Sequence, residues 1–348
     1  MEDAVFRAVI VGAGNMGRTW GRNLRDHGEV EIAGWVDLRP ELAADAAIEF
    51  TGGKARTGGD LERMLRDLHP DFVVDVSVPE AHHDVTLTAL AAGVPVLGEK
   101  PMADTMEHAR AMVAASERAG KLYMVSQSRR YHPQLTALRA LIQHEIGPLG
   151  ILNSDFYVGA HFGGFRDQMP SPLLLDMAIH TFDAARFLSG ADPLAVYCEE
   201  FNPSWSWYAG AASATALFEM TGGLRFTYRG SWCAEGQQTS WDADWRAVGP
   251  RGEAIWNGWH DPVARVAAER TGLIAETISH PGQVDPEEPS GIAASLRDFL
   301  RALRAGSTPM GECHDNIQSL AMVFAAIQSA ATGRRIAIEE VLPLAPGM

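Results

Sequence analysis

Residues 9–17 have the sequence VIVGAGNMG, and this stretch decides the fold of the N-terminal part of the chain. The apolar residues 6–11 predict a buried β-strand, and a helix is expected to begin directly after the glycines. In this setting Gly12 permits a tight turn, Gly14 lets the backbone approach a pyrophosphate, and Gly17 allows the helix to pack closely on the strand. The amide groups at the helix N-terminus would then face the anion. The G-x-G-x-x-G spacing thus predicts a dinucleotide site, although the spacing alone is equally typical of a packing feature.

The next predicted strand, residues 31–36, is followed by Asp37, which lies 20 residues after Gly17. A carboxylate at this distance hydrogen-bonds the ribose hydroxyls of a bound adenosine and repels a 2′-phosphate, which favours NAD over NADP. Arg39 follows two residues later and could hold that phosphate, so NADP is the alternative cofactor. A second interpretation of Asp37 is a residue that only starts a turn.

Strand and helix patterns alternate through the first third of the chain. This alternation is typical of a doubly wound parallel sheet, and we predict a Rossmann dinucleotide-binding domain over residues 1–126. The predicted strands cover residues 6–11, 31–36, 72–78, 95–97 and 121–126, and the predicted helices cover residues 16–25, 83–92 and 105–119, with one more helix after Pro40.

The pattern changes after residue 126, and we predict a substrate-binding and oligomerisation domain over residues 127–348. Short β-type runs fill residues 194–256 without a long helix between them, which indicates a large, mostly antiparallel sheet flanked by helices. The alternating apolar and aromatic residues of 224–232 predict an open apolar sheet face, through which the chain would form a homodimer or homotetramer. Helices are predicted at residues 133–144, 291–304 and 315–331, and an exposed loop is predicted at residues 280–289.

Composition limits the classes of function that the chain can have. It contains 348 residues with a net charge of −15, of which 46% are apolar and 21% are charged. The negative charge argues against nucleic acid or an anionic membrane as a partner. No apolar run reaches the roughly 20 residues of a membrane span, and the N-terminus has no signal-peptide pattern, so we expect a cytoplasmic protein. The three cysteines are far apart and lack a C-x-x-C spacing, so neither a disulfide framework nor a metal site is expected.

The tripeptide Glu99-Lys100-Pro101 follows the predicted strand at residues 95–97. Only three of the 29 Lys and Arg residues are lysines, namely Lys54, Lys100 and Lys121. A partly buried lysine can lose its proton and take part in acid–base chemistry, whereas arginine stays charged. Lys100 is therefore a candidate catalytic residue, and the alternative is a surface lysine that precedes a turn proline.

Residues 171–183 have the sequence SPLLLDMAIHTFD, which predicts a helix with Ser171 as N-cap and Pro172 as its first residue. Asp176 and His180 are four residues apart, so they lie on one face of this helix. Their neighbours are apolar, so two ionisable groups stand in a helix that is otherwise expected to be buried. A histidine in such a helix is often a satisfied core residue, but a carboxylate one turn away favours a shared role in a site.

Together these segments resemble the glucose–fructose oxidoreductase / inositol dehydrogenase / rhizopine catabolism protein family, abbreviated Gfo/Idh/MocA. The resemblance covers essentially the full length, and it is also carried by Ser77-Val78-Pro79 and by Arg129-Arg130-Tyr131. One departure is the run Ser-Pro-Leu-Leu-Leu before Asp176, where the family often has a glycine-rich run. This departure leaves the shape of the substrate loop open.

The resemblance implies hydride transfer between a carbon of a sugar or cyclitol and a nicotinamide cofactor. Lys100, Asp176 and His180 would then line the substrate pocket. His180 is expected to act as the base, with Asp176 orienting it and Lys100 polarising the reacting oxygen. The resemblance leaves open whether His180 or Lys100 is the base, and the reaction requires no metal.

The residues expected to bind the cofactor all lie in the predicted Rossmann domain or directly after it. They are Gly12, Gly14, Asn15, Met16, Gly17, Asp37, Leu38, Arg39, Ser77, Pro79, His83, Glu99, Lys100 and Gln127. The residues expected to bind the substrate are Arg130, Tyr157, His161, Arg166, Asp176 and His180.

Two other functions remain open at this point. Some members of the family are NAD-dependent glycosidases that oxidise their substrate transiently, eliminate the aglycone and reduce the product again. A few relatives bind the cofactor without catalysis and act as sensors, but a sensor has no use for Lys100, Asp176 and His180 together. The tryptophans after residue 200 are suited to stacking on sugar rings and are equally suited to packing within the sheet.

Overall fold

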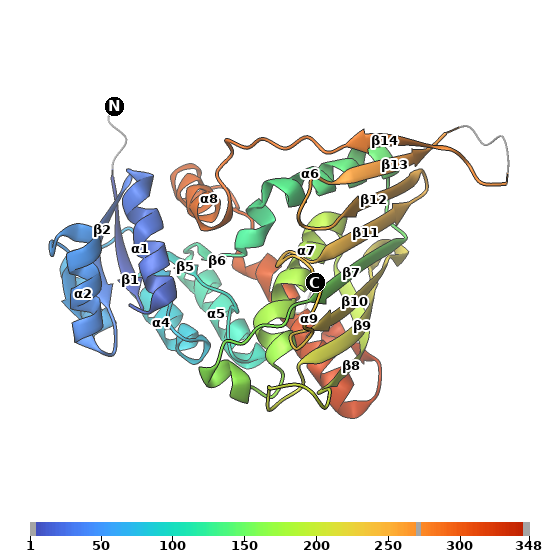
Figure 1. The fold of residues 1–348 in the computed structure, drawn as a ribbon. Coiled ribbons are helices and arrows are strands. Elements are labelled where there is room, and N and C mark those ends of the chain that lie inside the picture. Colours follow the sequence, from blue (N-terminus) through green and yellow to red (C-terminus); the bar gives the residue numbers. More distant parts are fainter. Residues whose placement is uncertain (1–4, 269–272, 344–348) are drawn as a thin grey trace. The chain divides into compact units, whose positions relative to one another are not determined.

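The computed structural model describes residues 5–268 and 273–343 of the chain, which form two units (Figure 1). The first unit is Met1–Ser128 with Pro289–Ile317, and the second is Arg129–Glu288 with Gln318–Met348. The first boundary, after residue 128, lies near the predicted boundary after residue 126. Residues 289–317 return to the first unit, whereas we expected them in the second domain.

The first unit is built on a six-stranded parallel sheet with the strand order β3-β2-β1-β4-β5-β6. This order is that of a Rossmann fold, in which ligands bind beyond the carboxyl ends of the strands where the strand order reverses, here between β1 and β4. The strands are β1 Phe6–Val11, β2 Val30–Val36, β3 Arg56–Gly58, β4 Phe72–Asp75, β5 Val96–Gly98 and β6 Tyr123–Val125. The helices are α1 Asn15–His27, α2 Pro40–Thr51, α3 Leu61–Leu68, α4 Pro79–Ala91, α5 Met106–Ala119 and α8 Gly291–Ala305.

Helix α8 explains why the late segment belongs to the first unit. Phe72 of β4 is fully buried, and its ring lies 5.3 Å from the ring of Phe299 on α8. Ser295 of α8 also donates a hydrogen bond of 2.9 Å to Ser126, directly after β6. Figure 1 shows α8 alongside α1, in agreement with the contacts between the two helices.

Two elements of the first unit were not predicted, and two strands, β4 and β6, are shorter than predicted. Strand β3 has three residues and none of them is buried, so it leaves no hydrophobic pattern in the sequence. Helix α3 has only eight residues and follows the N-cap Asp60, whose side chain accepts a hydrogen bond from the amide of Arg63. Strand β4 ends at Asp75 rather than at residue 78, because the Asp75 carboxylate accepts hydrogen bonds from the amide and hydroxyl of Ser77 and so starts a turn.

The second unit is built on a nine-stranded sheet with the order β14-β13-β12-β11-β7-β10-β9-β8-β15. All neighbouring strands are antiparallel except β7 and β10, which are parallel. Its strands are β7 Ile151–Tyr157, β8 Pro193–Phe201, β9 Ser213–Met220, β10 Arg225–Ser231, β11 Asp244–Gly249, β12 Gly252–Trp256, β13 Val263–Ala267, β14 Thr277–Pro281 and β15 Ile336–Ala337. Its helices are α6 Pro133–Leu141, α7 Ile179–Ser189, α9 Cys313–Thr332, whose first turn belongs to the first unit, and α10 Ile338–Val341.

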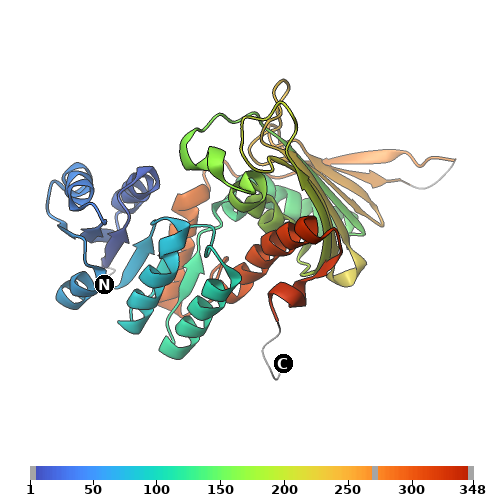
Figure 2. The same ribbon diagram turned by 90° about the horizontal axis from the view of Figure 1, so that it is seen from below.

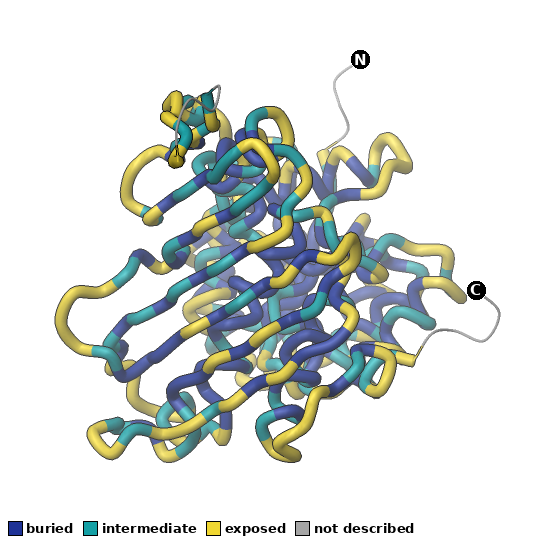
Figure 3. Tube along the Cα trace, turned by 90° about the vertical axis from the view of Figure 1, so that its right-hand side faces the viewer, coloured by how far each residue is buried: buried dark blue, intermediate teal, exposed yellow. Residues whose placement is uncertain are grey.

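Helices α6, α7 and α9 pack against one face of this sheet (Figures 1 and 2). Phe182 of α7 anchors that contact, with ring centroids 4.8 Å from Phe218 and 5.2 Å from Tyr228. Buried and more exposed residues alternate along the strands, as expected for a sheet covered on one face (Figure 3). Strand β14 extends to Pro281, so the predicted loop at residues 280–289 begins two residues too early.

The apolar residues of β10 do not form an open face, and this part of the prediction is wrong. Phe226 and Tyr228 are fully buried against the chain's own helices, and the alternating positions Arg225, Thr227 and Arg229 point to the other face. The apolar residues of β10 therefore give no support for pairing of two chains, and the homodimer or homotetramer stays a prediction. No helix in the described part of the chain is long and apolar enough to cross a membrane.

Candidate active site

Each of the three glycines in the loop after β1 has different surroundings. Gly12 has a φ of +107°, and a Cβ there would lie 2.5 Å from the carbonyl oxygen of Val76. A Cβ on Gly17 would lie 2.2 Å from the carbonyl oxygen of Gly12, so both positions exclude larger residues. At Gly14, by contrast, no described atom lies within 4 Å of the place that a Cβ would take. The loop therefore packs tightly on the protein side and is open at Gly14, where a phosphate group would approach.

The start of α1 is suited to an anion. Gly14 is the N-cap, and among the described residues no side chain caps the amides of this first turn, which also contains no acidic residue. These amides and the helix dipole can therefore serve a bound phosphate. Asp37, after β2, accepts a 2.8 Å hydrogen bond from the amide of Ala13 through one carboxylate oxygen and a 2.9 Å bond from the amide of Arg39 through the other. Asp37 thus ties the glycine loop to the second strand.

Further predicted residues follow the carboxyl ends of the other strands. Ser77 follows β4, Glu99 and Lys100 follow β5, and Gln127 follows β6. Lys100 is partly buried, unlike the exposed Lys54 and Lys121, and its peptide bond to Pro101 is cis.

Glu99 is held by its neighbours in the first unit. Its carboxylate accepts a 2.7 Å hydrogen bond from the indole of Trp20 and a 3.1 Å bond from the backbone amide of Lys100. Burial raises the pKa of Glu99, and these two hydrogen bonds and the Lys100 charge offset that rise only in part. The carboxylate is therefore fixed in direction, and with it the start of the segment that carries Lys100.

Gln127 has a feature that fits a bound ligand. It is 2% exposed, and both polar atoms of its amide lack a hydrogen-bond partner among the described residues. A buried amide with two unpaired atoms is costly unless a ligand or water pairs with it. Large apolar side chains are also exposed after three of the strands, although such residues are normally covered. They are Met16, Leu38 and Val78, with exposed fractions of 45%, 93% and 61%.

A buried pair beneath Ser77 was not predicted from the sequence. Asp75 and His82 are 0% and 2% exposed, and the His82 Nδ1 lies 3.0 Å from the Asp75 carboxylate. Burial alone would lower the pKa of His82, but the Asp75 carboxylate outweighs burial and raises it. The predicted His83, one residue later, instead stacks on His108 at 4.2 Å and contacts Asp84. His82 and His83 are adjacent in the sequence, and only their different burial in the structure distinguishes them.

In the second unit, the predicted helix over residues 171–183 begins with a π-helical turn, Leu173–Ala178, before α7. Such turns are rare and occur frequently at functional sites. Between residues 171 and 188 only Leu175, Asp176 and His180 are even partly exposed. The hydroxyl of Ser171 donates to Glu200 at 2.9 Å rather than capping the helix, so the predicted N-cap role is wrong.

Asp176 is paired with Arg166, which was also predicted. The guanidinium Nε of Arg166 lies 2.5 Å from the Asp176 carboxylate, with the two side chains 33% and 15% exposed. The same guanidinium lies 5.1 Å from the ring of Phe162 and 4.8 Å from the ring of Phe165. Phe162 in turn lies 5.2 Å from Trp232. An arginine and an aromatic cluster therefore adjoin the acidic residue of this helix.

The other predicted substrate residues have different surroundings. Arg130 is buried and forms two hydrogen bonds, of 2.7 and 2.6 Å, with the carboxylate of Asp183. Tyr157 alternates along β7 with the buried Phe156, so it lies on the sheet face opposite α7. His161 is mostly exposed and stacks on Trp207 at 3.7 Å. Arg130 and Tyr157 are therefore not part of the proposed substrate site. The side chain of Arg130 is held by Asp183, and Tyr157 lies on the sheet face opposite α7.

The predicted residues thus form two groups that belong to different units. The glycine loop, Asp37, Ser77, Glu99 and Lys100 are in the first unit, whereas Arg166, Asp176 and His180 are in the second.

Comparison with known proteins matches two parts of the chain to described domains. Residues 6–127 match the domain described as "Oxidoreductase family, NAD-binding Rossmann fold", and residues 135–255 match the "GFO/IDH/MocA C-terminal domain". A D-apiose dehydrogenase of Paraburkholderia graminis is 27% identical over 99% of this chain and 92% of its own length. An inositol 2-dehydrogenase of an Arthrobacter species is 34% identical over 54% of this chain and 55% of its own length.

A solved structure shares the whole fold. It is an oxidoreductase from Agrobacterium radiobacter in complex with NAD+, L-tartaric acid and magnesium, which superposes with a TM-score of 0.85 at 21% identity, covering 97% of this chain and 99% of that one. The predicted fold, the oxidoreductase class and the NAD-binding domain are confirmed. The chain belongs to the Gfo/Idh/MocA family of NAD-binding oxidoreductases.

Proposed function

We propose that this protein oxidises a secondary hydroxyl group of a sugar, a sugar derivative or a cyclitol, with NAD as the oxidant. The observation that carries the proposal is the accessible pair Asp176 and His180 on a helix that is otherwise buried except for Leu175. Leaving two ionisable groups accessible on a helix that is otherwise almost entirely buried favours a role in binding or proton transfer. The relatives named as apiose and inositol dehydrogenases support a polyhydroxylated substrate.

The residues after the first-unit strands fit NAD. The open backbone at Gly14 and the uncapped amides of α1 suit its pyrophosphate. Each carboxylate oxygen of Asp37 accepts one backbone hydrogen bond and keeps a second lone pair for a ribose hydroxyl. The unpaired amide of Gln127 would gain a partner. When bound, NAD supplies the acceptor for the hydride that leaves the substrate carbon.

The protein supplies the path for the proton that leaves the same hydroxyl group. In the proposed reaction His180 accepts this proton, because a neutral imidazole can accept one near neutral pH. Lys100 donates a hydrogen bond to the reacting oxygen and stabilises the negative charge that develops on it. Asp176, fixed by Arg166, orients His180 or accepts a hydrogen bond from a neighbouring substrate hydroxyl.

The aromatic cluster next to Arg166 gives the substrate site an apolar side. Phe162 and Trp241 are 46% and 45% exposed, and their ring centroids lie 6.2 Å apart. Aromatic faces of this kind suit the C–H faces of a sugar or cyclitol ring. The proposed substrate therefore contacts charged groups on its hydroxyl edge and aromatic rings on its carbon face.

The proposal is tested with a panel of monosaccharides, glycosides and inositols, with NAD reduction followed by nicotinamide absorbance. We expect one class of polyol to reduce NAD, and His180→Asn to lower kcat by roughly 10²–10⁴-fold. The matched control is His144→Asn, which changes an exposed histidine of the second unit and leaves turnover unchanged. A turnover in His180→Asn equal to that of the wild type would contradict the proposed role of His180 as the base.

The same panel distinguishes the alternatives. A glycosidase of this family would release the aglycone from a glycoside without net formation of NADH. A sensor would bind NAD without turning over any member of the panel. Either outcome would overturn the proposed dehydrogenase activity.

A further inference from the structure

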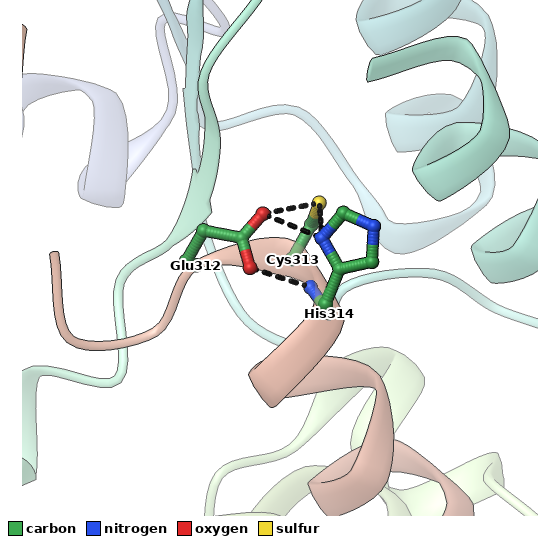
Figure 4. Close-up of side chains that lie close together, drawn as sticks. All are labelled: Glu312, Cys313 and His314. Carbon is green, nitrogen blue, oxygen red and sulfur yellow. Dashed lines mark hydrogen bonds and ion pairs between the residues drawn. The ribbon is translucent and has the colours of Figure 1, made fainter. Parts of the chain in front are cut away.

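Four side chains that can bind a metal converge in the first unit, and none of them belongs to the residues discussed above. Glu312, Cys313 and His314 stand at the start of α9, and Glu117 stands near the end of α5. A carboxylate oxygen of Glu312, the Sγ of Cys313 and a ring nitrogen of His314 lie within 4.8 Å of one another (Figure 4). Among the described residues no other trio of His, Cys, Asp or Glu side chains meets in this way.

The three donor atoms form a triangle close to the size that a tetrahedral metal requires. The Sγ of Cys313 lies 2.9 Å from Oε1 of Glu312 and 3.5 Å from Nδ1 of His314, and the distance between Oε1 and Nδ1 is 2.8 Å. Zinc bonds of about 2.0–2.3 Å at tetrahedral angles place neighbouring ligand atoms roughly 3.3–3.8 Å apart. The side chains would have to spread by less than about 1 Å to admit the ion.

Glu117 occupies the position of a second carboxylate that orients the imidazole. Its Oε1 lies 2.9 Å from Nε2 of His314, the ring nitrogen that faces away from Cys313. Metal-bound histidines usually donate their other N–H to such a carboxylate, which fixes the tautomer and the ring orientation. With the proton on Nε2, the lone pair of Nδ1 points at the carboxylate of Glu312, an arrangement that a cation between them stabilises.

The surroundings leave one side of the cluster accessible. Glu117, Glu312 and His314 line an open pocket of about 660 Å³, and Cys313 is fully buried behind them. The Sγ–H of Cys313 donates a hydrogen bond to the carboxylate of Glu312. A bound metal ion would take the place of this proton, because the thiolate is the form of cysteine that binds metals.

We propose that Glu312, Cys313 and His314 bind one divalent transition-metal ion of the zinc class, with Glu117 as a positioning residue and the fourth coordination position open to the pocket. Thiolate, imidazole and carboxylate are the donors that Zn²⁺ takes in proteins, and Co²⁺ occupies such sites as a spectroscopic probe. All four residues lie outside the proposed NAD and substrate residues, so the site does not depend on the proposed reaction.

The test uses the full-length protein without an affinity tag, stripped of metal and titrated with Co²⁺ and then Zn²⁺. We expect one equivalent of Co²⁺ to produce a thiolate charge-transfer band, and Zn²⁺ to displace it. Cys313→Ser should abolish the band, whereas Cys233→Ser, which changes a buried cysteine flanked by serine hydroxyls, should keep it. Absence of a band in the wild type, or its persistence in Cys313→Ser, would overturn the proposal.

Glu117→Gln separates a metal site from an ordinary cluster of hydrogen bonds. It should keep the charge-transfer band and raise the dissociation constant of Zn²⁺ about 10- to 100-fold, as loss of an orienting carboxylate does. Zn²⁺ should also raise the melting temperature of the wild type and not that of Cys313→Ser, and circular dichroism would verify that both variants fold. If His314 only forms an ion pair with the two carboxylates, no variant will show a change in metal affinity.

Discussion

The carboxyl edge of the first-unit sheet and the Leu173–Ser189 helical segment of the second unit are built in opposite ways. At the sheet edge the important groups are backbone amides and glycines, and apolar side chains such as Leu38 stand exposed beside them. In the helical segment nearly every residue is buried, and Asp176 and His180 are two of the four that are accessible. The first region is suited to binding a group of fixed shape, and the second to presenting two ionisable side chains.

This difference shows where specificity can vary. A site built from backbone changes little when side chains change, so the first region is expected to bind the same cofactor in many relatives. The second region depends on individual side chains and on their partners, such as Arg166 beside Asp176. We therefore expect variants of the first region to affect cofactor use and rate, and variants of the second to affect the choice of substrate.

The largest effect is expected where the first region contributes a side chain to the chemistry. Lys100→Ala should lower kcat roughly 10²–10⁴-fold while the protein still folds and binds NAD, because the developing negative charge loses its donor. Turnover and NAD affinity would be measured together. Lys121→Ala is the control, since Lys121 is exposed. Wild-type turnover in Lys100→Ala would leave the first region as a cofactor site without catalytic side chains.

The next effect concerns the stability of the helical segment. Asp183 is 2% exposed and accepts hydrogen bonds from Arg130 and Ser319. Asp183→Asn leaves the buried guanidinium of Arg130 uncompensated and should lower the free energy of unfolding by about 3–5 kcal/mol. The control is Asp155→Asn, which breaks an exposed pair with Arg229 and should cost about 0–1 kcal/mol in denaturant unfolding. Equal losses in the two variants would mean that the buried pair does not stabilise the segment.

A smaller effect is expected when the partner of Asp176 is removed. Arg166→Ala should lower kcat/KM by roughly 10- to 100-fold, since a hydrogen bond to a charged group contributes about 1.5–3 kcal/mol. The loss should appear mainly in KM if Arg166 only positions the substrate. Arg246→Ala, at an exposed arginine of the same unit, is the comparison. An unchanged KM and kcat would remove Arg166 from the proposed site.

The smallest effect concerns the pair of Asp75 and His82. Because the folded protein raises the pKa of His82, the pair stabilises the fold fully below the ordinary histidine pKa of about 6.5, and this contribution is lost as pH rises through the folded value. The free energy of unfolding should therefore fall less between about pH 6 and 8 in His82→Gln than in the wild type. His314 shifts in the same direction, so only the difference between the two proteins is informative. Parallel pH profiles would show that His82 does not titrate in this window.

The sequence was sufficient to predict the groups whose role is set by local geometry. The places of the three glycines and of Asp37 follow from spacing, because a strand, a tight turn and a helix determine where their atoms lie. The helices predicted at residues 105–119 and 315–331 were found for the same reason, because their periodicity is local.

The sequence was insufficient where pairing joins distant residues. Nothing local distinguishes His82 from His83, since only the buried Asp75 makes the first one important. Arg130 and Arg166 were equally good candidates until their partners, Asp183 and Asp176, were known. The side of the sheet on which Tyr157 lies depends on strand register, which a short alternating run does not fix.

The return of residues 289–317 to the first unit has a consequence for how the gene can vary. The chain passes between the units three times, after residues 128, 288 and 317. A recombination event that exchanged only codons 1–128 would pair the new strands with the old α8, whose Phe299 packs against Phe72. A new nucleotide-binding half can therefore be inherited intact only if two separate stretches of the gene are exchanged together.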